Sequence, residues 1–197
     1  PEEMAKAARQ LPQGILDMGN EIRVFMPKFG CINERRHQLH EVIRLSGMNL
    51  IINDTDHALL IKVASVPSAR MQVYFIDNEE YFKRKADTHD AEGNFFPDND
   101  ERALFFGRGV LETVRKLGWA PDIIHCHGWM TAFVPLYVRH HFSDDPHFEN
   151  AKLVFSVHDQ KAEPLDKELA KKLAMEGFDK DLLKGLNKPT TDDLVKF

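Results

Sequence analysis

The sequence predicts an α/β fold with a doubly wound, mostly parallel sheet and an inserted antiparallel β-hairpin element. Two observations support this fold class. From residue 98 onward, helix-like and strand-like runs alternate and are separated by short polar turns, which is the pattern of parallel βαβ units. Between residues 40 and 77, several β-rich runs follow one another with turn residues between them, which is the pattern of hairpins.

The start of the chain predicts one helix and one strand. Residues 2–19 carry their apolar side chains on one stripe and end in a glycine that is suited to a C-terminal cap. Pro12 is expected to bend this helix. Residues 21–26 then alternate like a strand. No strand precedes the helix, although a parallel unit would place one there, so we expect one α/β domain over residues 1–197 that lacks its first strand.

The middle of the chain predicts the hairpin element, a short helix and a loop. The expected strands are residues 41–45, 49–52, 59–66 and 71–76. Residues 79–82 are expected to form one helical turn. The polar residues 83–97 are interpreted as an exposed loop.

The second half of the chain begins with the longest helical pattern, residues 98–117. Its expected buried stripe consists of Leu104, Phe105, Val110, Leu111 and Val114. The partial dinucleotide fingerprint at residues 107–112 lies inside this helix and lacks its third glycine, so we discard it. The other expected elements are strands over 123–127 and 151–158 and helices over 129–140, 167–176 and 181–186. The charged segment after Asp159 is a linker or the solvated end of the same domain, and we favour the second interpretation.

Composition excludes several classes of protein. The chain has 197 residues, of which 43% are hydrophobic and 29% charged, as in ordinary globular proteins. A net charge of −5 does not suit a general nucleic-acid binder, which needs a basic surface. Two cysteines cannot form a disulfide framework, which favours a reducing, cytoplasmic setting. No apolar run approaches the ~20 residues that a membrane-spanning helix needs.

Two imidazoles stand at the end of a predicted strand, in the stretch IIHCHGWMT. Because strand side chains alternate, His125 and His127 share one face and Cys126 lies on the other. Ligands bind at the carboxyl ends of strands in open α/β sheets, and Gly128 lets a ligand approach the backbone. His158 ends the next strand in the same way. The two strand ends therefore predict a polar cleft.

Three kinds of site are compatible with this strand end: a metal site, a substrate-binding site or core histidines. A structural zinc site needs four ligands, and no CxxC or HxxxH pair completes them. Cys126 and His127 point to opposite faces, so they cannot form a thiolate–imidazolium pair. His125 is expected to be buried and hydrogen-bonded to backbone, and Trp129 to be a core residue or an apolar support. His127 is the candidate to face a ligand.

Five stretches together resemble the N-terminal domain of bacterial glycogen synthases and plant starch synthases, a family of glycosyltransferases. Residues 125–131 read H-C-H-G-W-M-T where the family has H-x-H-D-W-H-T. The other stretches are 23–30, similar to R-V-x-M-P-x-Y-G, 74–82, similar to F-I-D-N-x-x-Y-F, 96–102, similar to P-D-N-x-E-R-F, and 157–158, similar to the start of I-H-N-x-A-Y-Q-G. They follow the family's order from about residue 2 to residue 159.

The resemblance implies a Rossmann-like domain that is one half of a two-domain glycosyltransferase fold, with the second, nucleotide-binding domain absent from this chain. It implies transfer of glucose from ADP-glucose or UDP-glucose to the non-reducing end of an α-1,4-glucan, with retention and with no metal or cofactor. His127 aligns with the family's histidine at the reacting centre, and Lys28 or Arg102 is expected to help orient substrate. The implied substrate-binding residues are His158, Gly128, Trp129, Asp98, Asn99 and Arg102.

The chain departs from the family at the donor loop. The family's first helix follows K-T-G-G-L, which holds the nucleotide diphosphate, and Glu2 and Glu3 take the place of its glycines. Carboxylates suit a helix N-terminus but repel a diphosphate. At ~4 Å and an effective dielectric near 20, each like-charge contact between one of these carboxylates and the diphosphate costs on the order of 4 kcal/mol. Gly128 and Met130 also replace the family's Asp and His. The alternative function is therefore an inactive single-domain relative that binds a glucan or a protein.

Overall fold

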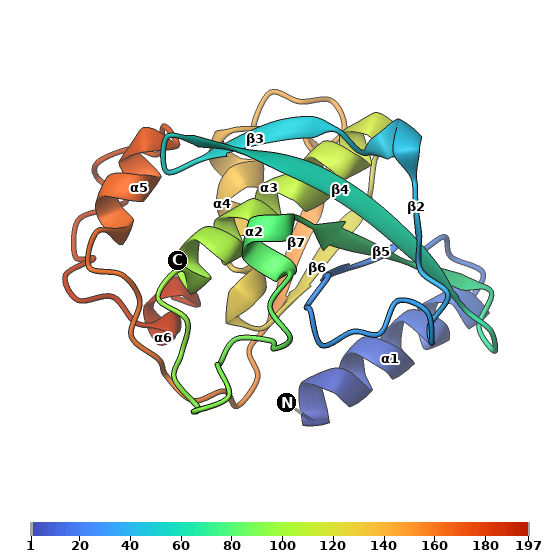
Figure 1. Cartoon of the computed structure of the whole chain (residues 1–197). Helices are drawn as coiled ribbons and strands as arrows, with labels where there is room; N and C mark the ends of the chain where they lie inside the picture. The colour runs from blue at the N-terminus through green and yellow to red at the C-terminus, as the bar shows by residue number, and fades with distance from the viewer. Residues whose placement is uncertain (1, 197) are drawn as a thin grey trace. The chain divides into compact units, whose positions relative to one another are not determined.

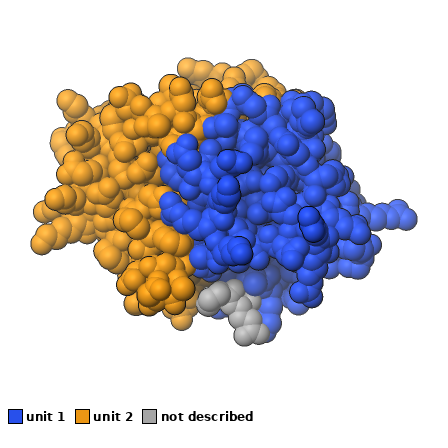
Figure 2. All heavy atoms as spheres, viewed as in Figure 1, with its two compact units in different colours: residues 1–48, 58–87 blue, residues 49–57, 88–197 orange. Residues whose placement is uncertain are grey.

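A computed structural model describes residues 2–196, which form two compact units (Figures 1 and 2). Unit 1 comprises residues 1–48 and 58–87, and unit 2 comprises residues 49–57 and 88–197. Within the described residues, no helix combines the length and hydropathy that crossing a bilayer requires. The single domain over residues 1–197 stays a prediction.

Unit 1 holds most of a mixed five-stranded sheet with the strand order β1-β5-β4-β2, in which β3 pairs with β4. The strands are β1 (Val24–Pro27), β2 (His40–Glu41), β3 (Met48–Ile52), β4 (Thr55–Val66) and β5 (Met71–Asp77). β1 and β5 are parallel, whereas β4 runs antiparallel to both β2 and β5. The α/β class with an inserted antiparallel element is confirmed.

Local chemistry explains the turns of this sheet. Asn53 and Asp54, between β3 and β4, have φ angles of 49° and 61°, the left-handed values that a two-residue type I′ hairpin turn requires. Residues 43–45 form a 3₁₀ helix, η1 (Ile43–Leu45), and not the end of the predicted strand. The hydroxyl of Ser46 donates to Val42 O (3.1 Å) and accepts from Ile61 N (2.9 Å). This side chain thereby replaces a backbone partner in the ladder and interrupts the strand.

The two helices of unit 1 lie close to their predicted positions. α1 (Glu2–Asp17) contains Pro12 and is followed by Gly19 at a φ of 84°. Its apolar stripe is only partly covered, and Leu11 is 40% exposed. α2 (Glu79–Phe82) is a single turn whose first amides, Glu80 N and Tyr81 N, donate to the side-chain oxygen of Asn78 at 3.0 and 3.1 Å. This bond is an N-cap, so the helix begins where the capping residue stands.

Unit 2 contains the parallel β-α-β arrangement that the sequence predicts. Its elements are α3 (Asn99–Leu117), β6 (Ile123–His127), the 3₁₀ helix η2 (Trp129–Thr131), α4 (Phe133–His140), β7 (Lys152–Ser156), α5 (Leu169–Met175) and α6 (Thr191–Leu194). β6 and β7 pair in parallel as a separate two-stranded sheet. β7 is shorter than predicted, so His158 follows the strand and is not part of it.

α3 is the central helix of unit 2, and its predicted stripe is buried. Gly107 lies on the side of α3 that faces α4. A Cβ at Gly107 would lie 3.4 Å from the backbone nitrogen of Val134 and 3.5 Å from Phe133 Cβ. These are ordinary contact distances, and they place Gly107 inside a helix that packs beside α4, which agrees with the rejection of the dinucleotide fingerprint at residues 107–112.

The segment after Asp159 belongs to the same compact unit as residues 88–158. That it is the end of one domain over residues 1–197 stays a prediction. Within this segment, Leu165 N donates to Pro189 O at 2.8 Å and Thr191 N donates to Glu163 O at 2.9 Å, and Glu163 N donates to the hydroxyl Oγ1 of Thr191 at 3.0 Å. Tyr137 Oη on α4 donates to Glu176 Oε2 at 3.0 Å. The helix predicted at 181–186 is wrong: these residues form successive i to i−3 turns that end at Gly185, with a φ of 101°. The short helix α6 was not predicted.

Lys172 joins α5 to the start of α3. Its Nζ lies 2.9 Å from Asp100 Oδ2, 2.8 Å from Glu101 Oε2 and 2.9 Å from Asp166 Oδ2. Lys172 is 4% exposed and Asp100 is fully buried. Burial alone lowers the pKa of an ammonium, but the three carboxylates outweigh it and raise the pKa of Lys172. Burial raises the pKa of Asp100, against the effect of Lys172.

Replacing Lys172 with methionine is expected to destabilise the protein by about 3–5 kcal/mol, because Asp100 is left buried without its cation. Urea unfolding at neutral pH measures this loss. Lys171→Met, at the exposed neighbouring position, is the matched control and should change stability by less than about 0.5 kcal/mol. Equal unfolding midpoints for the two variants would contradict the assignment.

Gly30 lies where two backbone segments of unit 1 approach each other. A Cβ at this position would overlap the backbone carbonyl of Arg84. Gly30→Ala is therefore expected to cost about 3 kcal/mol or more, because backbone cannot move aside as a side chain can. Gly14, inside α1, has open space at its Cβ position, and Gly14→Ala should stabilise the protein by about 0.5–1 kcal/mol. Thermal unfolding of both variants checks the opposite signs.

Candidate functional site

The carboxyl ends of β6 and β7 bring two of the predicted site residues together. The parallel register pairs His125 with Val154 and His127 with Ser156. His127 is the last residue of β6, and His158 lies two residues beyond the end of β7. Because both strands run in the same direction, their ends meet at one edge of the sheet, as predicted from the two strand-end histidines.

A hydrogen bond joins the two histidines. His127 Nδ1 lies 3.0 Å from His158 Nε2. The His127 ring also stacks on His125, with ring centroids 4.2 Å apart and planes 30° apart. His125 Nε2 in turn lies 2.8 Å from Ser156 Oγ. The ring of His127 is thus fixed at one nitrogen and on one face, while the residue stays half-buried.

The predicted environment of His125 needs one correction. The ring is half-buried and bonds to a side-chain hydroxyl, and not to the backbone. The reason is the one-to-one register of β6 and β7, which places Ser156 on the same face as His125 and His127.

Electrostatics keep these rings neutral. Burial lowers the pKa of His127, and the neighbouring rings of His125 and His158 lower it further. Burial, followed by His158, lowers the pKa of His125. The ordinary value is 6.5, so both rings are neutral at pH 7 and can donate one hydrogen bond and accept another.

Cys126 lies on the opposite face of β6, as predicted. It is 4% exposed, and burial raises the pKa of its thiol to about 12. A thiol that stays protonated at neutral pH is not a nucleophile. Cys31, in unit 1, is exposed, and neither cysteine forms a disulfide.

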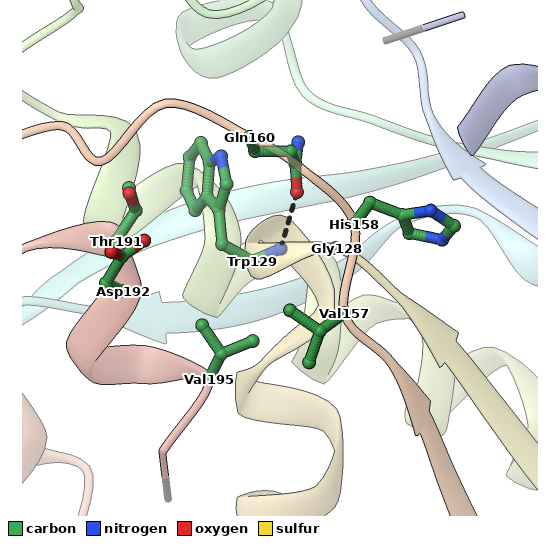
Figure 3. A pocket seen from close by; sticks show the side chains of 8 residues that line it. All are labelled: Gly128, Trp129, Val157, His158, Gln160, Thr191, Asp192 and Val195. Carbon is green, nitrogen blue, oxygen red and sulfur yellow. Dashed lines mark hydrogen bonds between the residues drawn. The ribbon is translucent and has the colours of Figure 1, made fainter. Parts of the chain in front are cut away.

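Gly128 and Trp129 shape the turn that follows β6. Gly128 has a φ of 75° and a ψ of 169°, a conformation that favours glycine. Trp129 is buried and packs on Phe95, with ring centroids 5.5 Å apart, as predicted for a core residue or an apolar support, and its contact with substrate stays a prediction. The backbone N–H of Trp129 donates to Gln160 Oε1 at 3.2 Å (Figure 3).

A small hollow lies beside this turn, lined by Trp129, His158, Gln160, Thr191 and Val195 among others (Figure 3). Its volume of about 30 Å³ admits a water molecule but no sugar ring. The ring of His158 points away from the other side chains drawn in Figure 3, and its Nε2 is bonded to His127. This hollow is therefore not the place where a sugar could contact His127. Such a ligand would have to reach the half-exposed ring of His127 from another side.

Three other predicted residues stand at the start of α3. Asp98 is half-buried and precedes the helix, whereas Asn99 and Arg102 are fully buried. Arg102 Nη1 donates to Asn99 Oδ1 at 2.6 Å, and Asn99 Nδ2 donates to Thr88 O at 2.9 Å. The Arg102 guanidinium also lies 5.3 Å from the ring centroid of Phe96. These contacts connect the loop at residues 88–98 to α3, and a direct contact with substrate stays a prediction.

The remaining predicted positions belong to unit 1. Glu3 is exposed in the first turn of α1, and the side chain of Glu2 lies outside the described residues. Lys28 is buried and forms an ion pair with Glu34 at 3.1 Å. Its role in orienting substrate stays a prediction.

Some residues at the strand ends were not predicted. Ser156 and Gln160 were overlooked because serine and glutamine carry no pattern of their own, although Ser156 shares the face of His125 and could have been found from the register. Thr191 is brought to the hollow from the far end of the chain, and no local signal predicts this. Among the residues the structure describes, no group of three or more His, Cys, Asp or Glu side chains is arranged to hold a metal ion.

This arrangement is that of a Rossmann-like α/β fold, a class in which ligands bind at the carboxyl ends of parallel strands. The model of the family described as "Starch synthase catalytic domain" matches residues 3–191. The chain belongs to this family.

Curated relatives and one solved structure agree with this assignment. The glycogen synthase of Chlorobaculum tepidum is 38% identical in an alignment of 191 positions that covers 91% of this chain and 39% of that protein. The glycogen synthase of Chlorobium chlorochromatii is 43% identical over 156 residues, which are 79% of this chain and 32% of that protein. The chain thus spans about a third of the length of these relatives.

The fold has a solved counterpart in the catalytic domain of starch synthase IV from Arabidopsis thaliana, which was determined bound to ADP and acarbose. The two structures superpose with a TM-score of 0.70 at 22% sequence identity, over 90% of this chain and 34% of that chain. This likeness shows the shared Rossmann-like fold.

The lowered pKa values of His125 and His127 predict a pH-dependent stability. Between the lowered folded values and the ordinary value of 6.5, the unfolded chain binds protons that the folded chain does not, so stability falls as the pH drops through this window. We expect the stability difference between the wild type and a His125→Asn/His127→Asn double variant to shrink from pH 7.5 to pH 5. Urea titrations over this range measure it. A difference that is constant with pH would contradict the lowered values.

Proposed function

We propose that this chain is part of a glucosyltransferase of the glycogen and starch synthase type. The observation that carries the proposal is the half-exposed ring of His127 at the end of β6, in a chain that belongs to the starch synthase catalytic domain family. The proposed reaction transfers glucose from ADP-glucose or UDP-glucose to the non-reducing end of an α-1,4-glucan, with retention of configuration.

The chemistry of glycosyl transfer fits a neutral, fixed imidazole. The transition state is similar to an oxocarbenium ion, and preorganised dipoles near the reacting centre stabilise developing charge without reorganising. The His127 ring is hydrogen-bonded to His158 and stacked on His125. The edge of the ring that is not bonded to His158 therefore presents a preorganised dipole. In the proposed reaction His127 contacts the transferred glucosyl group, next to the backbone of Gly128.

The other predicted residues receive roles that follow from their surroundings. His158 bonds to His127, and Trp129 supports the turn after β6. Asn99 and Arg102 are buried, so we propose that they influence substrate binding indirectly, by holding the loop at residues 88–98 in place. Asp98 is only half-buried, so it is the most accessible of the three residues to a substrate.

The partners are proposed from the relatives. The Arabidopsis starch synthase IV structure contains ADP and acarbose, which supports a nucleotide and an oligosaccharide as the ligand classes. Because this chain spans about a third of its curated relatives, we propose that a second, nucleotide-binding domain completes the site. The two unpaired cysteines support a cytoplasmic setting.

A second candidate function is favoured by Glu3. This carboxylate is exposed in the first turn of α1, where a donor diphosphate would meet its negative charge. The candidate is an inactive relative that binds a glucan or a protein. The binding of sugar nucleotide separates the two functions, because only the enzyme requires it.

Calorimetric titrations of the protein with ADP-glucose, UDP-glucose and a maltooligosaccharide test these candidates. The enzyme predicts saturable heat with a nucleotide sugar and with the glucan. Heat with the maltooligosaccharide alone, together with no transfer of labelled glucose to glycogen, would reject the enzyme and support the binding module.

His127→Ala is expected to lower glucosyl transfer by at least about a hundredfold, because the fixed dipole at the reacting centre is lost. Its unfolding midpoint should stay close to that of the wild type, because the ring is half-buried. His140→Ala, at the exposed end of α4, is the matched control and should keep full activity. Equal rates for the His127→Ala variant and the control would remove His127 from the reaction.

A further inference from the structure

While both rings are neutral, the bond between His127 and His158 allows two arrangements of protons. A hydrogen bond between two neutral imidazoles needs one N–H and one lone pair, and the contact joins Nδ1 of His127 to Nε2 of His158. In the first arrangement His158 Nε2–H donates, so both rings carry their proton on Nε2. In the second arrangement His127 Nδ1–H donates, so both rings carry their proton on Nδ1.

We propose that His158 is a positioning residue that holds His127 in its Nε2–H tautomer. The Nε2–H form is the intrinsically preferred tautomer of a neutral histidine side chain, and only the first arrangement gives both rings this form. In a protein, the hydrogen bond at one ring nitrogen decides which nitrogen carries the proton. His158 therefore acts on the chemistry of His127, and not only as a contact for substrate.

The surroundings of the pair restrict rotation of the His127 ring. His125 covers one face of the ring, with centroids 4.2 Å apart. The position of His125 is set by the 2.8 Å contact between its Nε2 and Ser156 Oγ. A flip of His127 would break the bond to His158, because the carbon on the other side of the ring would then face it. His125, Ser156 and His158, from β6, β7 and the segment after β7, thus fix both the orientation and the tautomer of His127.

The consequence is a defined donor at the strand end. His127 Nε2 has no hydrogen-bond partner among the described residues 2–196, and the residue is half-exposed. With the proton on Nε2, this atom presents an N–H and no lone pair. It binds an acceptor oxygen of a ligand, such as a sugar hydroxyl, and it does not accept a proton. The sugar identity rests on the proposed function, whereas the tautomer does not.

Nitrogen NMR of the chain labelled with ¹⁵N-histidine tests the tautomer directly. Long-range proton–nitrogen correlations distinguish a protonated from an unprotonated ring nitrogen, and the His127→Gln variant identifies the signals of His127. At pH 7.5 we expect His127 to be protonated at Nε2 and unprotonated at Nδ1. His127 with its proton on Nδ1 would overturn the proposal, and this measurement needs no variant of His158.

Two variants of His158 test whether it is the cause. In His158→Phe the donor is lost, and we expect His127 to become a mixture of tautomers in exchange. In His158→Gln the amide N–H takes the place of Nε2–H, and we expect the wild-type signals of His127 to be retained. His140→Ala should also leave them unchanged. An unchanged His127 spectrum in His158→Phe would refute the role of His158.

Activity separates this inference from the proposed function. We expect His158→Phe to lower kcat by about a hundredfold, the cost of a misplaced group, and His158→Gln to restore most of it with little change in KM. The Nε2–H tautomer without any glucosyl transfer would reject the proposed function and leave the tautomer assignment standing. Transfer that is equally fast in His158→Phe would reject the positioning role alone.

Discussion

The parallel, one-to-one pairing of β6 with β7 is the constraint on which the site depends. A shift of one residue would move His125 and His127 to the opposite face from Ser156, because strand side chains alternate. The buried face of β6, represented by Cys126, makes such a shift costly. The same apolar packing that stabilises the sheet therefore also sets the distance between His127 and His158, which are 31 residues apart in the sequence.

The residues that carry the family resemblance fall into two groups in the structure. Asn78, Asn99 and Arg102 are buried and use their polar atoms for a helix cap, a loop and a side-chain pair. Buried polar groups of this kind are costly to leave without partners, so these three residues have structural roles at the starts of α2 and α3. His127 and His158 form the other group, because they are half-exposed and bonded to each other.

Much of the fold could be predicted because its signals are local. The long apolar pattern of α3 and the strand β6 come from neighbouring residues, and the turn at Asn53 follows from a backbone preference. The rest depends on partners that are distant in the sequence. Ser46 interrupts a strand by bonding to a residue on β4, and the turns that end at Gly185 replace a predicted helix. For the site, the strand-end histidines were predictable, but their mutual bond required the register.

The unequal exposure of the two cysteines has a practical consequence. Cys126 is buried with its thiol pKa near 12, whereas Cys31 is exposed. A maleimide reagent under native conditions will consequently attach to one position, in unit 1, and leave the strand that carries the histidines unlabelled. Residues 1–197 thus provide one accessible thiol for a fluorophore, from which ligand-dependent changes in unit 1 can be followed without removing either of their two cysteines.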